Sequence, residues 1–136
     1  MGFYEENSND MQDKKKKVLV IDDSEMNRQL LGNYFKNAGY STHFANDGEE
    51  GLRQFTELHP AITFLDIVMP NKSGLDLLKE IKELNSTAIV IIVSSYVTKR
   101  NIQQAKEYGA DWFLKKPFSR EQLVNVLDKI RNRSKK

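Results

Sequence analysis

Residues 17–22 read KVLVID, and residues 88–94 read AIVIIVS. Both stretches are rich in β-branched, apolar side chains, and neither alternates between apolar and polar positions. A strand with one solvated face alternates, whereas the strands of a parallel sheet are covered on both faces and are apolar throughout. These two stretches therefore predict buried central strands of a parallel sheet.

Along the rest of the chain, helical patterns alternate with short apolar stretches. This alternation predicts an α/β fold in which five parallel strands are joined by helices on both faces of the sheet. The commonest order for a doubly wound, flavodoxin-like sheet of five strands is 2-1-3-4-5, and we adopt it on that ground. The expected strands are residues 17–22, 42–45, 61–66, 88–94 and 112–115, and the expected helices are residues 24–38, 47–58, 75–84, 99–108 and 119–130.

A chain of 136 residues suffices for one domain with a sizeable core. We expect a flexible arm over residues 1–14, a folded domain over residues 15–132 and a basic tail over residues 133–136. The net charge of +2 arises at the C-terminal end, where the last six residues hold four Lys or Arg side chains and no acid. The body then offers no basic stripe, so we expect no direct binding to nucleic acid.

Composition excludes several other classes of protein. The chain has no cysteine, which rules out disulfides and Cys-based zinc sites. The longest apolar run, residues 88–93, is far shorter than the roughly 20 residues that a membrane span needs. The N-terminus has neither the basic start nor the apolar stretch of a secretory signal. We therefore expect a cytoplasmic protein without a membrane span.

Side chains with reactive groups follow four of the five expected strands. Asp22 and Asp23 follow the first strand and Asp66 follows the third, while Ser94 ends the fourth and Lys116 follows the fifth. In the expected order these strands are neighbours, and ligands of such sheets bind at the carboxyl edge where the order reverses. Three carboxylates, one hydroxyl and one ammonium group are therefore expected to converge in one site.

This set of groups points to phosphate chemistry with a metal ion. Neighbouring carboxylates raise one another's pKa unless a cation neutralises them, and oxygen ligands select a hard cation such as Mg²⁺, for which Mn²⁺ can substitute. Lys116 and Ser94 would contact phosphate oxygens. A carboxylate can itself act as the nucleophile and form an aspartyl phosphate. Asp66 is the best candidate because it follows the middle strand of the expected sheet.

Each of these residues taken alone also has a structural interpretation. Asp22 and Asp23 are suited to capping the helix that follows them. Asp66 is suited to a turn at the end of a strand, and Lys116 to a solvated loop. The functional interpretation rests on the agreement of four independent strand ends.

Four segments of the sequence carry a family resemblance: VLVIDDS (18–24), FLDIVMPNKSGLDLL (64–78), IIVSS (91–95) and GADWFLKKPF (109–118). In content and spacing they resemble a response-regulator receiver domain over roughly residues 15–132, of the chemotaxis-regulator-like, stand-alone kind. The resemblance implies a phosphorylation-dependent signalling switch of a two-component system or phosphorelay. Because the chain ends after the fifth expected helix, we expect its output to be the binding of a downstream protein.

The resemblance also implies roles for individual residues. Asp66 would accept a phosphoryl group from a phosphohistidine on a sensor histidine kinase or a histidine phosphotransfer protein. Asp23, Asp66 and the backbone carbonyl of Val68 would ligate Mg²⁺, with Asp22 acting chiefly through water. The protein would promote its own phosphorylation and dephosphorylation and would have no turnover substrate.

Further implied roles concern the switch itself. Ser94 matches the switch hydroxyl, Lys116 the lysine that contacts the phosphoryl group, and Phe113 the switch aromatic residue. Phosphorylation would draw Ser94 inward, Phe113 would fill the vacated space, and the face formed by the fourth helix, fifth strand and fifth helix would change shape. The resemblance further implies a cis peptide bond between Lys116 and Pro117.

Three positions depart from the family pattern. Ser94 stands where threonine is commoner, and Phe113 stands where tyrosine is commoner. Ser95 stands where the family prefers alanine or another small residue, and we expect it to crowd the phosphoryl pocket and alter the rates of phosphorylation or dephosphorylation. None of these departures removes a required group.

Two aromatic residues are candidates for a partner-binding face, Tyr96 and Trp112.

Three alternative functions are weighed against the receiver domain. A phosphate-independent adaptor of the same shape is the second interpretation. A flavodoxin-type enzyme is disfavoured because the acid pair after the first strand would repel a flavin phosphate. A haloacid-dehalogenase-type phosphatase would need a second acid where Val68 stands.

Overall fold

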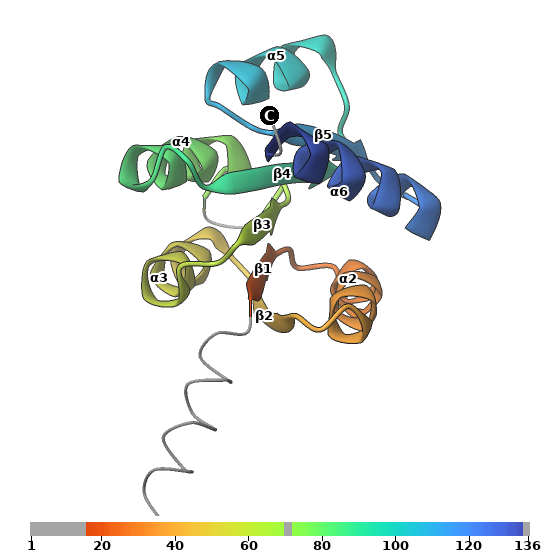
Figure 1. Ribbon diagram of the computed structural model, residues 1–136. Coiled ribbons are helices and arrows are strands. Elements are labelled where there is room, and N and C mark those ends of the chain that lie inside the picture. The colour runs from red at the N-terminus through yellow and green to blue at the C-terminus, as the bar shows by residue number, and fades with distance from the viewer. Residues whose placement is uncertain (1–15, 70–71, 135–136) are drawn as a thin grey trace, which may run out of the picture.

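The computed structural model describes residues 16–69 and 72–134, and the expected arm over residues 1–14 and the end of the expected tail, residues 135–136, lie outside the described residues. The described chain alternates strictly between strands and helices (Figure 1). The strands are β1 (Lys17–Ile21), β2 (Ser41–Ala45), β3 (Ile62–Leu65), β4 (Ile89–Ser94) and β5 (Trp112–Lys115). The helices are α2 (Glu25–Asn37), α3 (Gly48–Leu58), α4 (Gly74–Leu84), α5 (Lys99–Glu107) and α6 (Arg120–Ser134).

The strands form one parallel sheet in the order β2-β1-β3-β4-β5, which confirms the expected topology. Helices α2 and α6 lie on one face, and α3, α4 and α5 lie on the other (Figure 1). The order reverses at β1, because β2 lies on one side of it and β3 on the other. The carboxyl edge beside β1 and β3 is therefore the place where a ligand site is expected.

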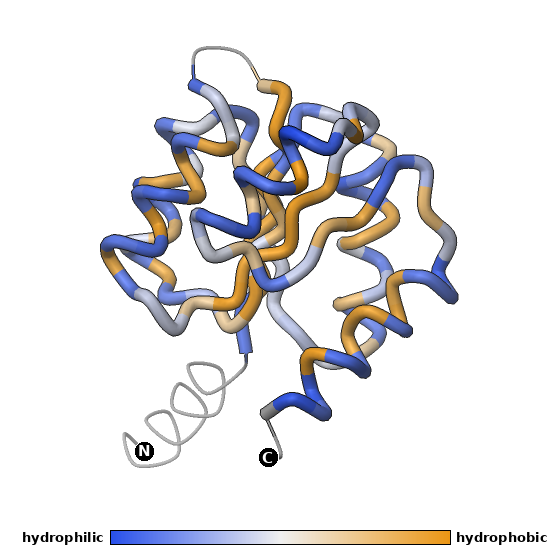
Figure 2. The backbone as a smooth tube through the Cα atoms, turned by 90° about the horizontal axis from the view of Figure 1, so that it is seen from above, coloured by the Kyte–Doolittle hydropathy of each residue, from blue (hydrophilic) through white to orange (hydrophobic). Residues whose placement is uncertain are grey.

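Alternate residues of each central strand enter two separate cores. Val18 and Val20 join the cluster beneath α2 and α6, whereas Leu19 and Ile21 join the cluster beneath α3, α4 and α5. Figure 2 shows the hydrophobic strands running through the middle of the molecule, with helices around them that alternate between hydrophobic and hydrophilic residues. This two-sided burial is the physical reason for the uninterrupted apolar strands.

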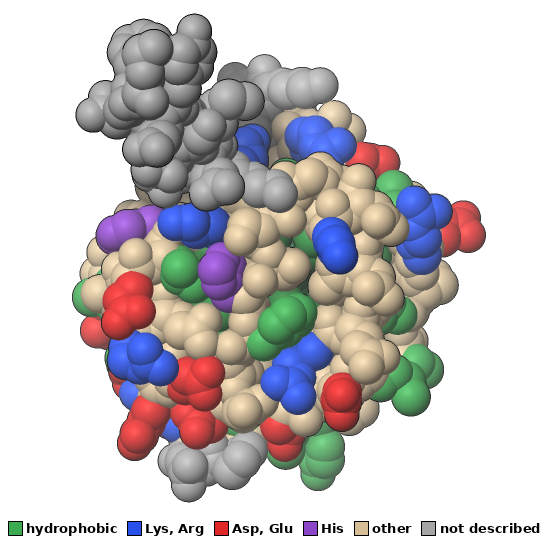
Figure 3. All heavy atoms as spheres, turned by 90° about the horizontal axis from the view of Figure 1, so that it is seen from below, with side chains coloured by type: hydrophobic (Ala, Val, Ile, Leu, Met, Phe, Trp, Pro, Cys, Tyr) green, Lys and Arg blue, Asp and Glu red, His purple; other side chains and the backbone are tan. Residues whose placement is uncertain are grey.

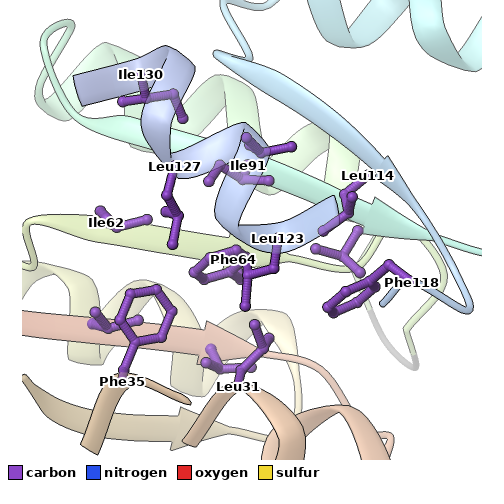
Figure 4. Close-up of a cluster of buried hydrophobic side chains, with 14 residues drawn as sticks. Leu31, Phe35, Ile62, Phe64, Ile91, Leu114, Phe118, Leu123, Leu127 and Ile130 are labelled. Carbon is purple, nitrogen blue, oxygen red and sulfur yellow. The ribbon is translucent and has the colours of Figure 1, made fainter. Parts of the chain in front are cut away.

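The cluster beneath α2 and α6 closes one face of the sheet. Leu31 and Phe35 approach it from α2, and Leu123 and Leu127 approach it from α6, with Phe64 of β3 between the two helices (Figure 4). The rings of Phe35 and Phe64 lie 5.5 Å apart between centroids. These contacts hold β3 firmly, and β3 is the strand that leads into Asp66.

Side chains next to the helices in sequence cap the N-termini of α2 and α6. The Ser24 side chain accepts a hydrogen bond from the Asn27 N–H at 3.4 Å and caps α2, so the capping residue is Ser24. At α6, the Gln122 N–H donates to the Ser119 hydroxyl at 3.1 Å and the Ser119 N–H donates to the Gln122 side chain at 2.8 Å. These two reciprocal hydrogen bonds form a capping box.

Helix α6 runs four residues beyond the expected end at residue 130, through Ser134. Its last turn carries Arg131 and Arg133, and basic side chains stabilise a helix C-terminus. Arg133 also forms an ion pair with Asp111, 2.7 Å between nitrogen and oxygen, which ties the last turn to the residue before β5.

Surface charge is mixed on the side of the molecule seen from below in Figure 3, where basic and acidic side chains are interspersed. Among the helices of the described ranges, none combines the length and the apolar character that crossing a membrane requires.

Candidate functional site

The ends of β1 and β3 bring two aspartates side by side. Ile21 pairs with Leu65 in the sheet, and the Asp66 N–H extends this pairing by donating to the Ile21 carbonyl at 3.0 Å. The Asp22 N–H donates to the Ala45 carbonyl of β2 at 3.1 Å. Because backbone bonds hold both residues at the carboxyl edge, their side chains project from fixed positions.

Lys116 joins these two carboxylates. Its Nζ lies 2.9 Å from Oδ2 of Asp22 and 2.9 Å from Oδ2 of Asp66. The Lys116 N–H donates to the Ser94 carbonyl at 2.9 Å, which places the lysine beside the end of β4. The peptide bond between Lys116 and Pro117 is cis, as the resemblance implied.

A third carboxylate completes an acid cluster. One oxygen from each of Asp22, Asp23 and Asp66 lies within 4.8 Å of the others. Asp22 is 2% exposed and Asp66 is 6% exposed, whereas Asp23 is open to solvent. One ammonium group does not balance three carboxylates, so the cluster has the charge and the donor atoms that suit a divalent cation of the hard, oxygen-binding kind.

Burial and charge shift the pKa values in this cluster. Burial raises the pKa of Asp66, the hydrogen bond and charge of Lys116 oppose that rise, and the charge of Asp22 adds to it. Burial lowers the pKa of Lys116, but its hydrogen bonds to Asp22 and Asp66 outweigh this effect and leave the pKa above its usual value. Lys116 is therefore charged at neutral pH, while the Asp66 carboxylate is held in a folded environment that disfavours its charge.

Hydrogen bonds orient the two buried carboxylates. Asp22 accepts from the Ser24 N–H at 2.8 Å and from the Asn27 side chain at 3.3 Å. Asp66 accepts from the Val68 N–H at 3.1 Å through its Oδ1. The oxygen of Asp66 that faces Lys116 is Oδ2, so the two oxygens have different partners. Asn27 is a site residue that the sequence alone does not reveal. Its polar side chain is buried beside Asp22 only because α2 packs against the end of β1.

Gly74 is a second missed residue. A Cβ atom at this position would lie 2.1 Å from the Asp66 carbonyl oxygen and 2.6 Å from the Ile67 Cα. The Gly74 N–H donates to the Ile67 carbonyl at 2.9 Å. The first turn of α4 therefore packs directly on the backbone that carries Asp66, and glycine permits this approach. The sequence shows a glycine in this turn but not the contact that requires it.

Of the expected switch residues, Ser94 ends β4, and Phe113 is the second residue of β5. Ser94 is fully buried, and its hydroxyl accepts a hydrogen bond from the Tyr96 N–H at 3.0 Å. Phe113 is partly buried against the core beneath α3, α4 and α5. Ser95 is exposed.

The remaining expected residues lie on the surface. Val68, next to the acid cluster in sequence, is 58% exposed. Tyr96 is 62% exposed and Trp112 is 38% exposed, with the Lys129 ammonium 4.9 Å from the Trp112 ring centroid. Asp22, Asp23, Asp66 and Lys116 thus form one contact group, and the two aromatic candidates lie outside it.

Comparison with known proteins agrees with this fold and site. The family model of the response regulator receiver domain matches residues 18–128, and the chain belongs to this family. Its function is therefore phosphorylation-dependent signalling in two-component systems. Receiver domains act as signalling switches.

Two relatives are close to the chain in length. Chemotaxis protein CheY of Thermotoga maritima is 34% identical over 116 residues, which cover 85% of this chain and 97% of the relative. Sporulation initiation phosphotransferase F of Bacillus subtilis is 34% identical over 113 residues, which cover 83% of this chain and 91% of the relative. Three other curated relatives are longer, and the chain spans 24% to 51% of their length.

A solved structure adds a ligand-bound relative. The CheX-CheY-BeF3-Mg+2 complex from Borrelia burgdorferi has a chain 28% identical to this one, with a TM-score of 0.80, and the match covers 85% of this chain and 88% of that chain.

Proposed function

We propose that Asp66 is the phosphoacceptor of this receiver domain and that its donor is a phosphohistidine on a sensor histidine kinase or a histidine phosphotransfer protein. The observation that carries the proposal is the position of Lys116, whose Nζ lies 2.9 Å from both Asp66 and Asp22. A lysine held between two buried carboxylates by paired contacts is suited to a phosphoryl oxygen that arrives on one of them.

In the transfer, an Asp66 oxygen bonds to phosphorus as the bond between phosphorus and the imidazole nitrogen of the donor breaks. The donor imidazole keeps the electron pair of that bond. Asp66 must be ionised to attack, and Lys116 favours the ionised form. Hydrolysis of the resulting acyl phosphate by water would reset Asp66, so the chain would promote both its phosphorylation and its dephosphorylation.

Three residues would hold the metal ion. Asp23, Asp66 and the backbone carbonyl of Val68 would ligate Mg²⁺ or Mn²⁺, with Asp22 acting chiefly through water. The proximity of three carboxylate oxygens, with one lysine to balance them, supports this assignment. When bound, the ion would neutralise charge on the carboxylates and on the incoming phosphoryl oxygens.

The signal would then pass along two neighbouring strands. Ser94 would exchange its hydrogen bond from the Tyr96 N–H for one to the phosphoryl group, and Phe113 would move into the space that Ser94 vacates. Phe113 belongs to β5 beside α5, so this movement would change the face formed by α5, β5 and α6, on which Trp112 is exposed. A downstream protein would bind this altered face.

Intact-mass measurement tests the proposal. The chain is incubated with Mg²⁺ and phosphoramidate, a small donor whose bond between phosphorus and nitrogen resembles that of phosphohistidine. We expect one phosphoryl adduct, lost with a chelator and lost in Asp66→Asn, while the exposed Asp128→Asn still forms it. An adduct that persists in Asp66→Asn would refute the assignment, and no adduct under conditions that label another receiver domain would favour the phosphate-independent adaptor.

A further inference from the structure

A groove of about 560 Å³ lies between α5 and the edge strand β5, away from the acid cluster. Its apolar lining includes Val97, Ile102 and Trp112. Val97 is 37% exposed and Trp112 is 38% exposed. These side chains present apolar surface to solvent at the rim of the sheet, which marks an interaction site when the surface is contiguous.

Positive charge surrounds this apolar surface. Lys106 and Lys115 line the groove and are exposed, and the Lys129 ammonium lies over the Trp112 ring. The acid in the lining, Asp111, is already engaged, because its carboxylate lies 3.0 Å from Lys82 and 2.7 Å from Arg133. The groove therefore suits an acidic segment that carries aromatic side chains.

The chain itself contains such a segment. Residues 3–6 read FYEE, an aromatic pair followed by an acid pair. Residues 1–13 as a whole hold four acidic side chains and no Lys or Arg. No other stretch of the sequence places two adjacent aromatic residues directly before two acids.

The segment is long enough to reach the groove. Residues 3–16 span at most about 45 Å when extended. Three strand spacings separate β1 from β5, roughly 14 Å across the sheet. Trp112 is in register with Ile91, Phe64 and Val20, three residues along β1 from Lys17, or about 10 Å.

We propose that residues 3–6 bind within the same molecule in the groove between α5 and β5. Phe3 and Tyr4 contact Trp112, and Glu5 and Glu6 face the lysines of the rim. Phe113 also lines the groove, so the bound segment competes with any partner that uses this face. This last consequence rests on the function proposed above, whereas the binding of the segment does not.

Trp112 is the single tryptophan of the chain, so its fluorescence reports on the groove directly. In the full, unphosphorylated chain we expect the double substitution Phe3→Ala, Tyr4→Ala to shift Trp112 emission to longer wavelength and to raise its quenching constant for acrylamide. Acrylamide is neutral, so the basic rim does not attract it. Ser8→Ala in the same segment is the matched control and should leave both quantities unchanged. Equal quenching constants in the wild type and the aromatic variant would overturn the proposal.

Charge reversal supplies an independent test. Glu5→Lys with Glu6→Lys should also expose Trp112, and adding Lys106→Glu with Lys115→Glu to that chain should restore its protection. If the added substitutions did not restore the protection, the assigned contacts of Glu5 and Glu6 with the lysines of the rim would be refuted. Protection that grows with protein concentration would place the segment on a second copy of the chain and overturn binding within one molecule. Because the chain is unphosphorylated throughout, these outcomes are separate from the phosphoryl-transfer test.

Discussion

We propose that Lys116 is the residue that makes the acid cluster a site for phosphate. It contacts Asp22 and Asp66 at the same distance, and Asp23 lies within reach of both carboxylates. The sequence places a lysine after the fifth strand, but only the fold shows that one ammonium group serves two carboxylates. Its charge is retained because its two partners outweigh the effect of its burial on the pKa.

Ser94→Ala tests the switch at the scale of one hydroxyl. The variant keeps Asp66, so we expect it to be phosphorylated, but the phosphorylated form loses one hydrogen bond to a charged group. That bond contributes about 1.5–3 kcal/mol, which lowers the equilibrium constant for the active arrangement roughly tenfold or more. The change in the NMR signals of Phe113 and Trp112 on phosphorylation measures the populations of the two arrangements.

Thr56→Ala is the control for this prediction. Thr56 is an exposed residue of α3 whose hydroxyl donates to the Leu52 carbonyl of the same helix, so its removal should leave the phosphorylation-induced change in the Phe113 signals intact. Equal responses from Ser94→Ala and the wild type would refute the role of the hydroxyl in the switch.

The raised pKa of Asp66 has a consequence for stability in the absence of divalent cations. Between the ordinary carboxyl pKa and the raised value, the folded chain binds more protons than the unfolded chain. The free energy of unfolding therefore falls as pH rises through this window. Asp66→Asn should remove this loss and be more stable than the wild type at neutral pH, as measured by urea unfolding from acidic to neutral pH.

Asp128→Asn, an exposed substitution on α6, serves as the matched control and should follow the wild-type dependence on pH. An Asp66→Asn chain that is less stable than the wild type at neutral pH would contradict the prediction, because the Lys116 contact would then outweigh the burial of the carboxylate.

At the scale of elements, the strand order creates the site. The strands and helices themselves were predicted correctly, because apolar strands without alternation and helices with regular apolar spacing are strong local signals. The order of the strands was adopted because it is the commonest for such a sheet, and the structure confirms it. The sequence could not give the contact of Asn27 with Asp22, which depends on how α2 packs over β1. Nor could it give the end of α6, where Arg133 pairs with Asp111, a residue 22 positions earlier.

Gly74→Ala tests the packing of α4 on the strand that carries Asp66. The added Cβ would meet the Asp66 carbonyl oxygen at 2.1 Å and the Ile67 Cα at 2.6 Å, and both of these atoms belong to the backbone. We expect the free energy of unfolding to fall by about 3 kcal/mol, and the yield of phosphorylated chain to fall with it. Urea unfolding and intact mass measure the two effects.

Gly32→Ala is the matched control within a helix. Its added Cβ would meet only the tip of the Phe44 ring, a side-chain atom of a residue that is 36% exposed, and no backbone. Alanine favours helix over glycine by about 1 kcal/mol, so this variant should be as stable as the wild type or more stable. If both variants lost the same stability, close packing at Gly74 would not be the cause.

At the scale of the whole molecule, two cores on opposite faces of one sheet stabilise the fold. They offset the repulsion among the carboxylates of the acid cluster, which by itself destabilises the folded chain. The acid cluster lies at the carboxyl edge, between helices that both cores hold in place. Charge repulsion in the cluster is tolerated because the stability comes from elsewhere in the fold. The same repulsion supplies the affinity for a cation.

Mg²⁺ should therefore stabilise the whole chain. A ligand that binds only the folded state at a hundredfold excess over its dissociation constant adds about 2.7 kcal/mol to the free energy of unfolding. Thermal unfolding with and without Mg²⁺ measures the gain, and Mn²⁺ should act in the same direction. The gain should shrink sharply in Asp23→Asn and persist in Asp128→Asn. A gain of equal size in all three chains would contradict a metal site in the acid cluster.

The most direct test of the central claim is to locate the phosphoryl group on the chain. Borohydride reduces an acyl phosphate to an alcohol and so converts a phosphorylated aspartate into homoserine, which peptide mass mapping identifies. After treatment with phosphoramidate and Mg²⁺, we expect homoserine at position 66 and unchanged aspartate at positions 22 and 23. Homoserine at position 22 or 23, or an adduct that yields no homoserine, would contradict this expectation.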